Sequence, residues 1–440
     1  LVAAGICSTG TFLGGPSLAG LYGPGYIMLF GLGQIPMTLF ILGVLGKKIN
    51  IIGRRTNAET YIDVFRYRFE NYKPLIFVLV ITILTFLVAA AVAEFTGGSR
   101  VIQLMSGIPF EYSLIAFGVI ITLYTALGGL RGVSIVAILQ GLIMTIASIF
   151  LIVGYLSYYK GFGPIVEGLA EIDMRLLTPN FGGEFPLIEL LGFWFTYGIG
   201  VLGLPWAVQS TLGYDSTKTM KQAIFIGTVF VAFWSIFVGW AGVAGRVFAP
   251  NLEVPDFNVP NLAQGILSEP VAGIILAGIA GAGQSTIGAL FILACGSIVV
   301  NVYKAFIKPD VSEQRVRFLT FVITAGIGLL TVILSLNPPP TLQIFISFSA
   351  GGCAAALISP LVLGLFWPRT NKYGAFAGVL GGLVSYILFS QINLGIPVLY
   401  QAPLIFAFLL SFTLTIVVSL ITEKPSKETI EIYFGSEKSA

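Results

Sequence analysis

The sequence predicts an all-α polytopic membrane protein, and three observations lead to this fold class. Hydrophobic residues make up 56% of the 440-residue chain and charged residues only 10%, whereas soluble proteins carry about 25% charged residues. Apolar stretches long enough to cross a bilayer as helices recur along the chain. Basic residues gather in alternate connectors between these stretches. The composition therefore excludes a soluble globular protein.

Twelve apolar stretches are candidate spans, because a helix needs about 20 apolar residues to cross the hydrocarbon core. The stretch 269–303 is long enough that it must tilt, bend or extend beyond the bilayer. Leu1 already lies in an apolar stretch without a basic segment before it, so we expect a truncated N-terminus rather than a signal peptide. In chain order the predicted spans are 1–22, 24–46, 74–104, 109–128, 132–158, 186–212, 220–247, 269–303, 316–336, 341–367, 373–393 and 400–422.

The basic residues give an orientation. Of the 23 Lys and Arg residues, 19 fall on one side of the predicted spans, and only Arg100, Lys160, Arg175 and Arg246 fall on the other. The positive-inside rule places the richer side, and with it the C-terminus, in the cytoplasm. The net charge of +3 is small and forms no basic patch outside the spans, which excludes a nucleic-acid-binding protein.

The segment 56–72 is too polar to span a membrane. Its apolar residues Tyr61, Ile62, Phe65 and Phe69 share one side of a helix, which is typical of an amphipathic helix in the membrane interface. A cytoplasmic loop helix explains the same pattern, and both interpretations stay open.

Glycine and proline interrupt two spans. The first contains GICSTGTFLGGPS at 5–17, and the sixth contains TYGIGVLGLP at 196–205. Freed backbone groups are tolerated in a bilayer only where they are buried or line a cavity, and two such breaks five spans apart are typical of inverted-repeat transporters. We therefore expect a first repeat at 1–158, an extracellular connector at 159–185, a second repeat at 186–367, two additional helices at 368–422 and a cytoplasmic tail at 423–440.

Ser285 and Thr286 are candidate ligands of a monovalent cation. They are adjacent hydroxyls in a helix of small residues, and the broken first span adds the carbonyls of Ala4 and Cys7. A divalent site needs more carboxylates, and the absence of histidine removes imidazole ligands. The alternative is that both hydroxyls bond back to the carbonyl of the preceding helical turn.

Glu94 is the acidic residue that lies within an uninterrupted apolar run, and intramembrane acids are often functional. It lies about 31 Å along a helix from Lys73, which places it near the outer face. It is a proton or cation site, a carboxylate that attracts a cationic substrate, or a hydrated interfacial carboxylate near Arg100.

The chain resembles the sodium:solute symporter family, most closely its sodium/pantothenate branch, over nearly all of 1–422. That family has a leucine-transporter-like 5+5 inverted repeat with flanking helices, which the resemblance implies here. The matching stretches are FLGGPSLAGLYGPG (12–25), LGKKINIIGRRTNAET (45–60), GIPFEYSLIAFGVIITLYTALGGLRG (107–132), GRVFAPNLEVPDFNVPNL (245–262), QSTIGAL (284–290) and PLVLGLFWPRTNKYGA (360–375).

The resemblance also implies site residues. The family's sodium site falls on the carbonyls of Ala4, Cys7 and Ala282 and the hydroxyls of Ser285 and Thr286. This overturns the helix back-bonding alternative. Its substrate positions fall on Thr11, Phe12, Tyr197 and Gly200.

Three departures from the family pattern bear on coupling. Ala137 replaces the usual Asp of the fifth span, Gly288 and Ala289 replace the hydroxyls of a second sodium site, and Ser210 replaces an Arg. We therefore expect no second sodium site, and proton coupling through Glu94 becomes an alternative.

The leading hypothesis is a secondary active transporter that imports a small organic carboxylate, pantothenate by resemblance, by sodium symport. Half-helix N-termini at the breaks are expected to hold the carboxylate. The alternatives are a proton-coupled or weakly sodium-dependent symporter of a monocarboxylate or amino acid, and a solute sensor on a transporter fold. An enzyme is disfavoured because no span contains an acidic pair or a metal cluster. Sodium is the only ion expected, with no cofactor and no obligatory protein partner.

Overall fold

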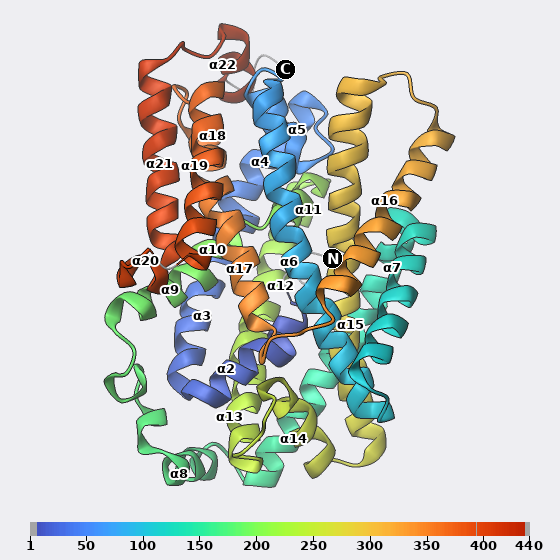
Figure 1. Cartoon of the computed structure of the whole chain (residues 1–440), viewed down its shortest axis with the longest axis vertical. Coiled ribbons are helices and arrows are strands. Elements are labelled where there is room, and N and C mark those ends of the chain that lie inside the picture. Colours follow the sequence, from blue (N-terminus) through green and yellow to red (C-terminus); the bar gives the residue numbers. More distant parts are fainter. Residues whose placement is uncertain (1–6, 393, 436–440) are drawn as a thin grey trace.

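The computed structural model describes residues 7–392 and 394–435, except for the side chains at 130 and 131. Every regular element of this part is a helix (Figure 1). Eleven spans within it are long and apolar enough to cross a membrane, and they match eleven of the twelve predicted ones. They are Pro24–Thr56, Lys73–Ser106, Phe110–Gly129, Gly132–Tyr159, Leu187–Gly213, Thr217–Phe248, Glu269–Ile307, Glu313–Leu334, Gln343–Phe366, Lys372–Gln391 and Pro403–Ile421.

The first predicted span begins outside the described residues. Its described part consists of a π-helical turn, η1 (Gly10–Gly14), and the short helix α2 (Gly15–Tyr22). The predicted break at 5–17 therefore ends in a change of helix type.

Two predicted spans form one long element, α7 (Phe110–Tyr159). Gly129 separates them with φ of +53°, a backbone conformation that glycine adopts without the steric penalty of a side chain. The uninterrupted spans are α6 (Lys73–Ser106), α16 (Glu313–Leu334), α19 (Lys372–Gln391) and α21 (Pro403–Ile421).

The remaining spans change helix type along their length. The long predicted stretch at 269–303 continues to Ile307 by way of a π-helical end. These spans consist of α3 (Pro24–Leu39), η2 (Phe40–Leu45) and α4 (Gly46–Thr56); α9 (Leu187–Tyr197), α10 (Ile199–Leu202), α11 (Pro205–Ser210) and η5 (Thr211–Gly213); α12 (Thr217–Phe233), η6 (Trp234–Val238) and α13 (Gly239–Phe248); α15 (Glu269–Cys295) and η8 (Gly296–Ile307); and α17 (Gln343–Cys353), η9 (Ala354–Ile358) and α18 (Ser359–Phe366).

Burial separates central helices from peripheral ones. In the most apolar window, 67% of residues are buried in α6 and in the spans that begin with α15 and α17, against 17% in α16. Helix α15 packs against α6 and α7, α17 packs against α6, and α19 pairs with α21 at one side of the bundle (Figure 1). The central helices are therefore the ones that can enclose a site.

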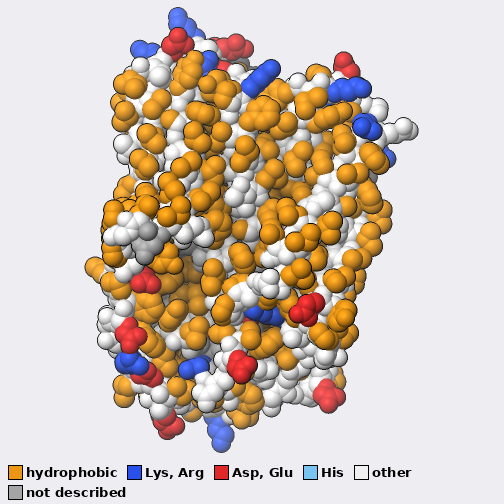
Figure 2. All heavy atoms as spheres, in the orientation of Figure 1, with side chains coloured by type: hydrophobic (Ala, Val, Ile, Leu, Met, Phe, Trp, Pro, Cys, Tyr) orange, Lys and Arg blue, Asp and Glu red, His pale blue; other side chains and the backbone are white. Residues whose placement is uncertain are grey.

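The outer surface is apolar across its middle. Figure 2 shows hydrophobic side chains over most of one face, with Lys and Arg gathered at the edge where α5, α18 and α22 lie in Figure 1. Large apolar side chains of α7, such as Leu127, Leu139 and Leu142, are exposed. An exposed apolar surface of this extent is what a bilayer covers.

Helix α5 (Tyr61–Arg68) decides between the two interpretations of segment 56–72. Tyr61, Ile62, Phe65 and Phe69 are all buried inside the protein. The interpretation as an interfacial helix is therefore wrong, and α5 is packed inside the protein, as the loop-helix alternative requires. Its cytoplasmic location stays a prediction. Its apolar side packs against α6, α11 and α18 rather than against lipid.

Short helices complete the chain. The predicted connector 159–185 contains α8 (Gly163–Ile172), η3 (Met174–Leu177) and η4 (Phe181–Gly183). The others are η7 (Pro255–Phe257), α14 (Asn258–Ile266), α20 (Pro397–Gln401) and α22 (Lys427–Phe434).

Candidate transport site

A cavity of about 80 Å³ lies where the two broken spans meet the central helices. Helices α3, α6, α15 and α17 complete its wall. Glu94 is the charged residue among those that line it. The polar part of the lining includes Ser8, Thr11, Gln34, Glu94, Thr196, Tyr197, Thr286, Gln343 and Ser349.

The break in the first span is held by internal hydrogen bonds. The backbone N–H and the hydroxyl of Thr9 both donate to Glu94 Oε2, at 3.0 and 2.8 Å. The N–H of Gly10 donates to Ser8 Oγ at 3.0 Å, and that of Thr11 to the Ser8 carbonyl at 2.9 Å. A helix N-terminus favours a negative charge, and here Glu94 supplies it. The expected place for a substrate carboxylate at this break is therefore already occupied.

Glu94 does not lie where the sequence predicted. Its side chain is only 2% exposed, and α6 continues for another twelve residues, about 18 Å, to Ser106. The interfacial alternative is wrong, because Arg100 pairs with Asp256 and Glu94 bonds to Thr9. Counting residues from the start of a helix shows neither where the helix ends nor which neighbour a side chain faces.

The break in the sixth span separates three short helices. Gly198 between α9 and α10 has φ of −91° and ψ of −84°, and Leu204 before α11 is extended. A Cβ atom on Gly203 would lie 2.4 Å from the Cα of Ala354, so glycine allows the broken segment to contact η9 directly. This break brings Tyr197 to the cavity.

The predicted hydroxyl pair lies beside one carbonyl. Ser285 Oγ and Thr286 Oγ1 both donate to the carbonyl of Ala282, at 2.9 and 3.2 Å. This is the back-bonding geometry of the alternative interpretation. It also places three oxygen atoms together, and a hydroxyl that donates keeps lone pairs with which it can bind a cation.

The other predicted sodium ligands lie in the broken first span. Ala4 lies outside the described residues, and Cys7 is buried. Ser8, which follows Cys7, lines the same cavity as Thr286. A Cβ atom on Gly283 would lie 2.8 Å from Thr9 Cγ2, so α15 contacts the first span close to the break.

The four predicted substrate positions separate into two pairs. Thr11 and Tyr197 line the cavity. Phe12 is buried, with its ring centroid 6.5 Å from that of Trp234, and Gly200 lies against Ala350; neither belongs to the lining. Only the first pair is brought together at the cavity.

Comparisons with known proteins decide the family. A model of the sodium:solute symporter family matches residues 1–382. The chain belongs to the sodium:solute symporter family. Sodium/pantothenate symporters of Haemophilus influenzae and Escherichia coli are each 34% identical to it over 88% of this chain and 80% of the relative. The sodium/proline symporter of Escherichia coli is 26% identical over 92% of this chain and 82% of the relative.

Solved structures agree on the fold. A Na⁺-coupled sialic acid symporter in a substrate-bound outward-open state superimposes with a TM-score of 0.77 at 17% identity, covering 97% of this chain and 91% of its own. Mhp1, a nucleobase-cation-symport-1 family transporter, gives 0.55 at 13% identity, covering 98% and 94%. The predicted all-α fold of the leucine-transporter type is confirmed. The symporter is a sodium-coupled secondary transporter of the cell membrane and not an enzyme.

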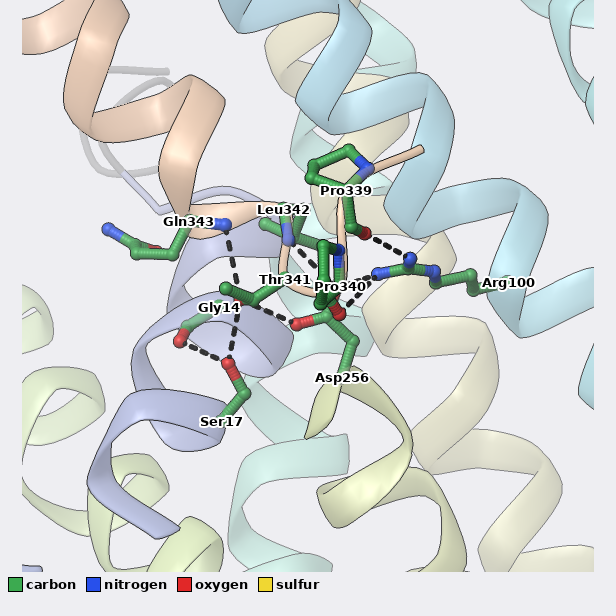
Figure 3. A network of polar contacts seen from close by, with 9 residues as sticks. All are labelled: Gly14, Ser17, Arg100, Asp256, Pro339, Pro340, Thr341, Leu342 and Gln343. Carbon is green, nitrogen blue, oxygen red and sulfur yellow. Dashed lines mark hydrogen bonds and ion pairs between the residues drawn. The ribbon is translucent and has the colours of Figure 1, made fainter. Parts of the chain in front are cut away.

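The symporter also contains a buried polar cluster that the sequence did not indicate (Figure 3). Arg100 of α6 forms an ion pair with Asp256 of η7 and donates to the Pro339 carbonyl at 2.6 Å. Asp256 accepts from Thr341 Oγ1 at 3.0 Å and from the Leu342 N–H at 2.9 Å. Burial raises the pKa of the Asp256 carboxyl, and Arg100 with the N–H and hydroxyl donors acts in the opposite direction.

This cluster connects to α2 at one edge and to the cavity at the other. Thr341 Oγ1 lies 3.0 Å from Ser17 Oγ of α2, and the N–H of Gln343 reaches Thr341 Oγ1 at 3.4 Å. Gln343 then donates through Nε2 to the Tyr197 hydroxyl at 3.1 Å. Gln343 is not among the site residues predicted from the sequence. The signal that could have indicated it is an uncharged polar residue at the start of an apolar span.

Proposed function

We propose that this symporter imports pantothenate together with sodium. The observation that carries the proposal is the 34% identity to two sodium/pantothenate symporters over 88% of the chain, against 24–26% for two proline transporters. The cavity supports it, because its lining combines hydroxyl and amide groups with apolar side chains, as a polar organic solute requires. No obligatory protein partner is needed for this activity.

The proposed sodium ligands are the carbonyls of Cys7 and Ala282 and the hydroxyls of Ser285 and Thr286, with Ala4 as a further carbonyl outside the described residues. Their support is the convergence of both hydroxyls on Ala282 and the shared cavity of Ser8 and Thr286. Thr11 and Tyr197 are the proposed substrate contacts. Phe12 and Gly200 would shape the site by packing behind it.

The proposed transport cycle rocks the first two spans of each repeat against the other helices of the two repeats; these four spans are 1–22, 24–46, 186–212 and 220–247. The repeats are 1–158 and 186–367, joined by the connector 159–185, with the helices of 368–422 and the tail 423–440 added. Sodium and solute bind between the broken spans in this cycle. The C-terminus and α22 would lie in the cytoplasm, on the side richer in Lys and Arg.

Uptake into proteoliposomes tests the sodium site. An inward sodium gradient should drive pantothenate uptake, and the variant Ser285→Ala/Thr286→Ala should reduce it at least about tenfold at low sodium, because two ion ligands are lost. Ser297→Ala is the matched control, since this buried serine also bonds to its own helix, at the Leu293 carbonyl, but does not line the cavity. Uptake independent of sodium in the wild type would reject the proposal.

A second candidate concerns the coupling ions. Glu94 places a carboxylate in the cavity, and pantothenate brings another, while one sodium ion supplies a single positive charge. A buried unbalanced charge is costly. We therefore propose that Glu94 takes a second monovalent cation, either a proton or a sodium ion bound apart from the family's second sodium site, whose hydroxyls are replaced here by Gly288 and Ala289.

Membrane potential tests this second candidate. With two cations per anion, an inside-negative potential should accelerate uptake, and Glu94→Gln should remove that acceleration. Varying pH at constant sodium, and then sodium at constant pH, distinguishes a proton from a second sodium ion. Glu111→Gln is the control, because Glu111 is exposed at the start of α7. Wild-type uptake that does not change with the membrane potential would contradict the proposal of a second cation.

A further inference from the structure

Two buried polar groups in the cavity wall lack a partner. Gln343 is 3% exposed and Ser349 is 1% exposed, and both line the cavity from α17. Neither Gln343 Oε1 nor Ser349 Oγ has a hydrogen-bond partner among the described residues. Buried polar atoms in proteins are nearly always paired, so unpaired atoms on residues that line a cavity indicate a ligand.

The position of the Gln343 amide is set from three sides. Nε2 donates to the Tyr197 hydroxyl, and the Gln343 N–H bonds to Thr341. Oε1 lies against the first span, where a Cβ atom on Gly14 would be only 2.3 Å away. The glycine of η1 therefore leaves room for the amide beside the break.

A hydroxyl group suits these two atoms best. An amide oxygen only accepts hydrogen bonds, whereas the serine hydroxyl donates or accepts. A solute hydroxyl can do both, so it satisfies Gln343 whichever end of the amide faces the cavity. A carboxylate cannot donate to Oε1, and Glu94 in the same lining repels it.

The neighbouring wall is apolar and suits a branched carbon skeleton. Val201, Leu204, Ile346 and Ala350 lie in the same lining. Pantothenate has two hydroxyl groups beside a carbon that carries two methyl groups, with its carboxylate at the opposite end. Resting on the proposed function, we propose that Gln343 and Ser349 bind the hydroxyl-bearing end of the solute and select for it.

A ratio of affinities tests the selection. Competition against labelled pantothenate should favour unlabelled pantothenate over its dideoxy analogue by at least about tenfold in the wild type, because the analogue leaves buried groups unpaired. Gln343→Met keeps the size of the side chain and should reduce this ratio to below about threefold, with Ser349→Ala having a smaller effect. A folding defect alone would lower the uptake of labelled pantothenate in both competition experiments and leave the ratio of the two affinities unchanged.

Gln140→Met is the matched control. Gln140 is also a buried glutamine, bonded to Gln284, but it does not line the cavity. Its ratio should equal that of the wild type. An unchanged ratio in Gln343→Met would overturn the inference, while the proposed function would stand if the wild type still transports pantothenate.

Binding to purified protein decides the inference independently of pantothenate transport. Pantoate and 3,3-dimethylbutanoate form a pair of carboxylates with and without the hydroxyls. The wild type should bind pantoate more tightly, and Gln343→Met should lose this preference. Equal affinity of the wild type for both compounds would reject hydroxyl recognition even if pantothenate proves not to be the substrate.

Discussion

Two buried aspartates, Asp256 and Asp63, organise polar clusters at different places in the symporter and do so in different ways. The Asp256 cluster (Ser17, Arg100, Asp256 and Thr341) joins α2, α6, η7 and the segment before α17 (Figure 3). Within the part of the chain that the structure describes, the Asp256 carboxylate bonds only to residues distant in the sequence. Asp256 therefore holds together segments that are distant in the sequence.

The Asp63 cluster (Thr60, Asp63 and Asn301) works mainly within one helix. Asp63 accepts from the Thr60 N–H at 3.0 Å and donates through its own N–H to Thr60 Oγ1 at 3.1 Å, which together form the capping box of α5. Its bond to a distant part of the chain is the one from Asn301 Nδ2 in η8, at 3.0 Å.

The comparison shows that the burial of an aspartate does not by itself indicate how much it contributes to the stability of the fold. Asp63 satisfies the start of its own helix, which forms from adjacent residues. Asp256 neutralises a cation on another helix, and its loss would leave that cation buried without a counter-ion. Substitutions at the two sites should therefore differ more than their similar burial indicates.

Asp256→Asn should have the largest effect. Removing one partner of a buried ion pair destabilises proteins by about 3–5 kcal/mol, so the midpoint of thermal unfolding in detergent should fall by several degrees. The double variant Arg100→Met/Asp256→Asn should recover part of this loss, because the unpaired charge is removed.

Asp173→Asn is the control for that prediction. Asp173 also pairs with an arginine, Arg175, but that pair is exposed. Exposed ion pairs contribute little, so its midpoint should not change. If the double variant is no more stable than Asp256→Asn alone, the ion pair is not what Asp256 contributes.

Asp63→Asn should have an intermediate effect. The amide keeps one acceptor oxygen but loses the negative charge at the helix N-terminus, which is worth about 1 kcal/mol. The same thermal unfolding measurement applies, with Glu59→Gln as a neighbouring control. A loss as large as that of Asp256→Asn would mean that the bond to Asn301 dominates and that the distinction between the two clusters fails.

Sequence reasoning succeeded where the signal is local. Apolar length predicted the spans, because hydrophobic stretches are read directly from adjacent residues. Glycine and proline marked both breaks, and the hydroxyl pair of α15 stood out in a helix of small residues.

It failed where the meaning of a residue depends on distant partners. Glu94 was placed by its depth, whereas its neighbour Thr9 lies 85 positions away. In the sequence Asp256 is one acidic residue of a connector, and only the fold places Arg100 beside it. Helix α5 is buried by other helices, which its own residue pattern does not identify. Gln343 gained its role from Tyr197 and the cavity.

Ser17→Ala should have the smallest effect and decides how far the Asp256 cluster extends. Ser17 Oγ also bonds to the Gly14 carbonyl at 2.8 Å, so part of its contribution is local to α2. Unfolding of Ser17→Ala, Thr341→Val and the double variant gives the coupling between the hydroxyls, expected at about 0.5–1 kcal/mol. Additive losses would mean that the cluster ends at Thr341. Coupling would mean that Asp256 also restrains the broken first span, since Ser17 bonds to the carbonyl of Gly14 and Gly14 belongs to η1.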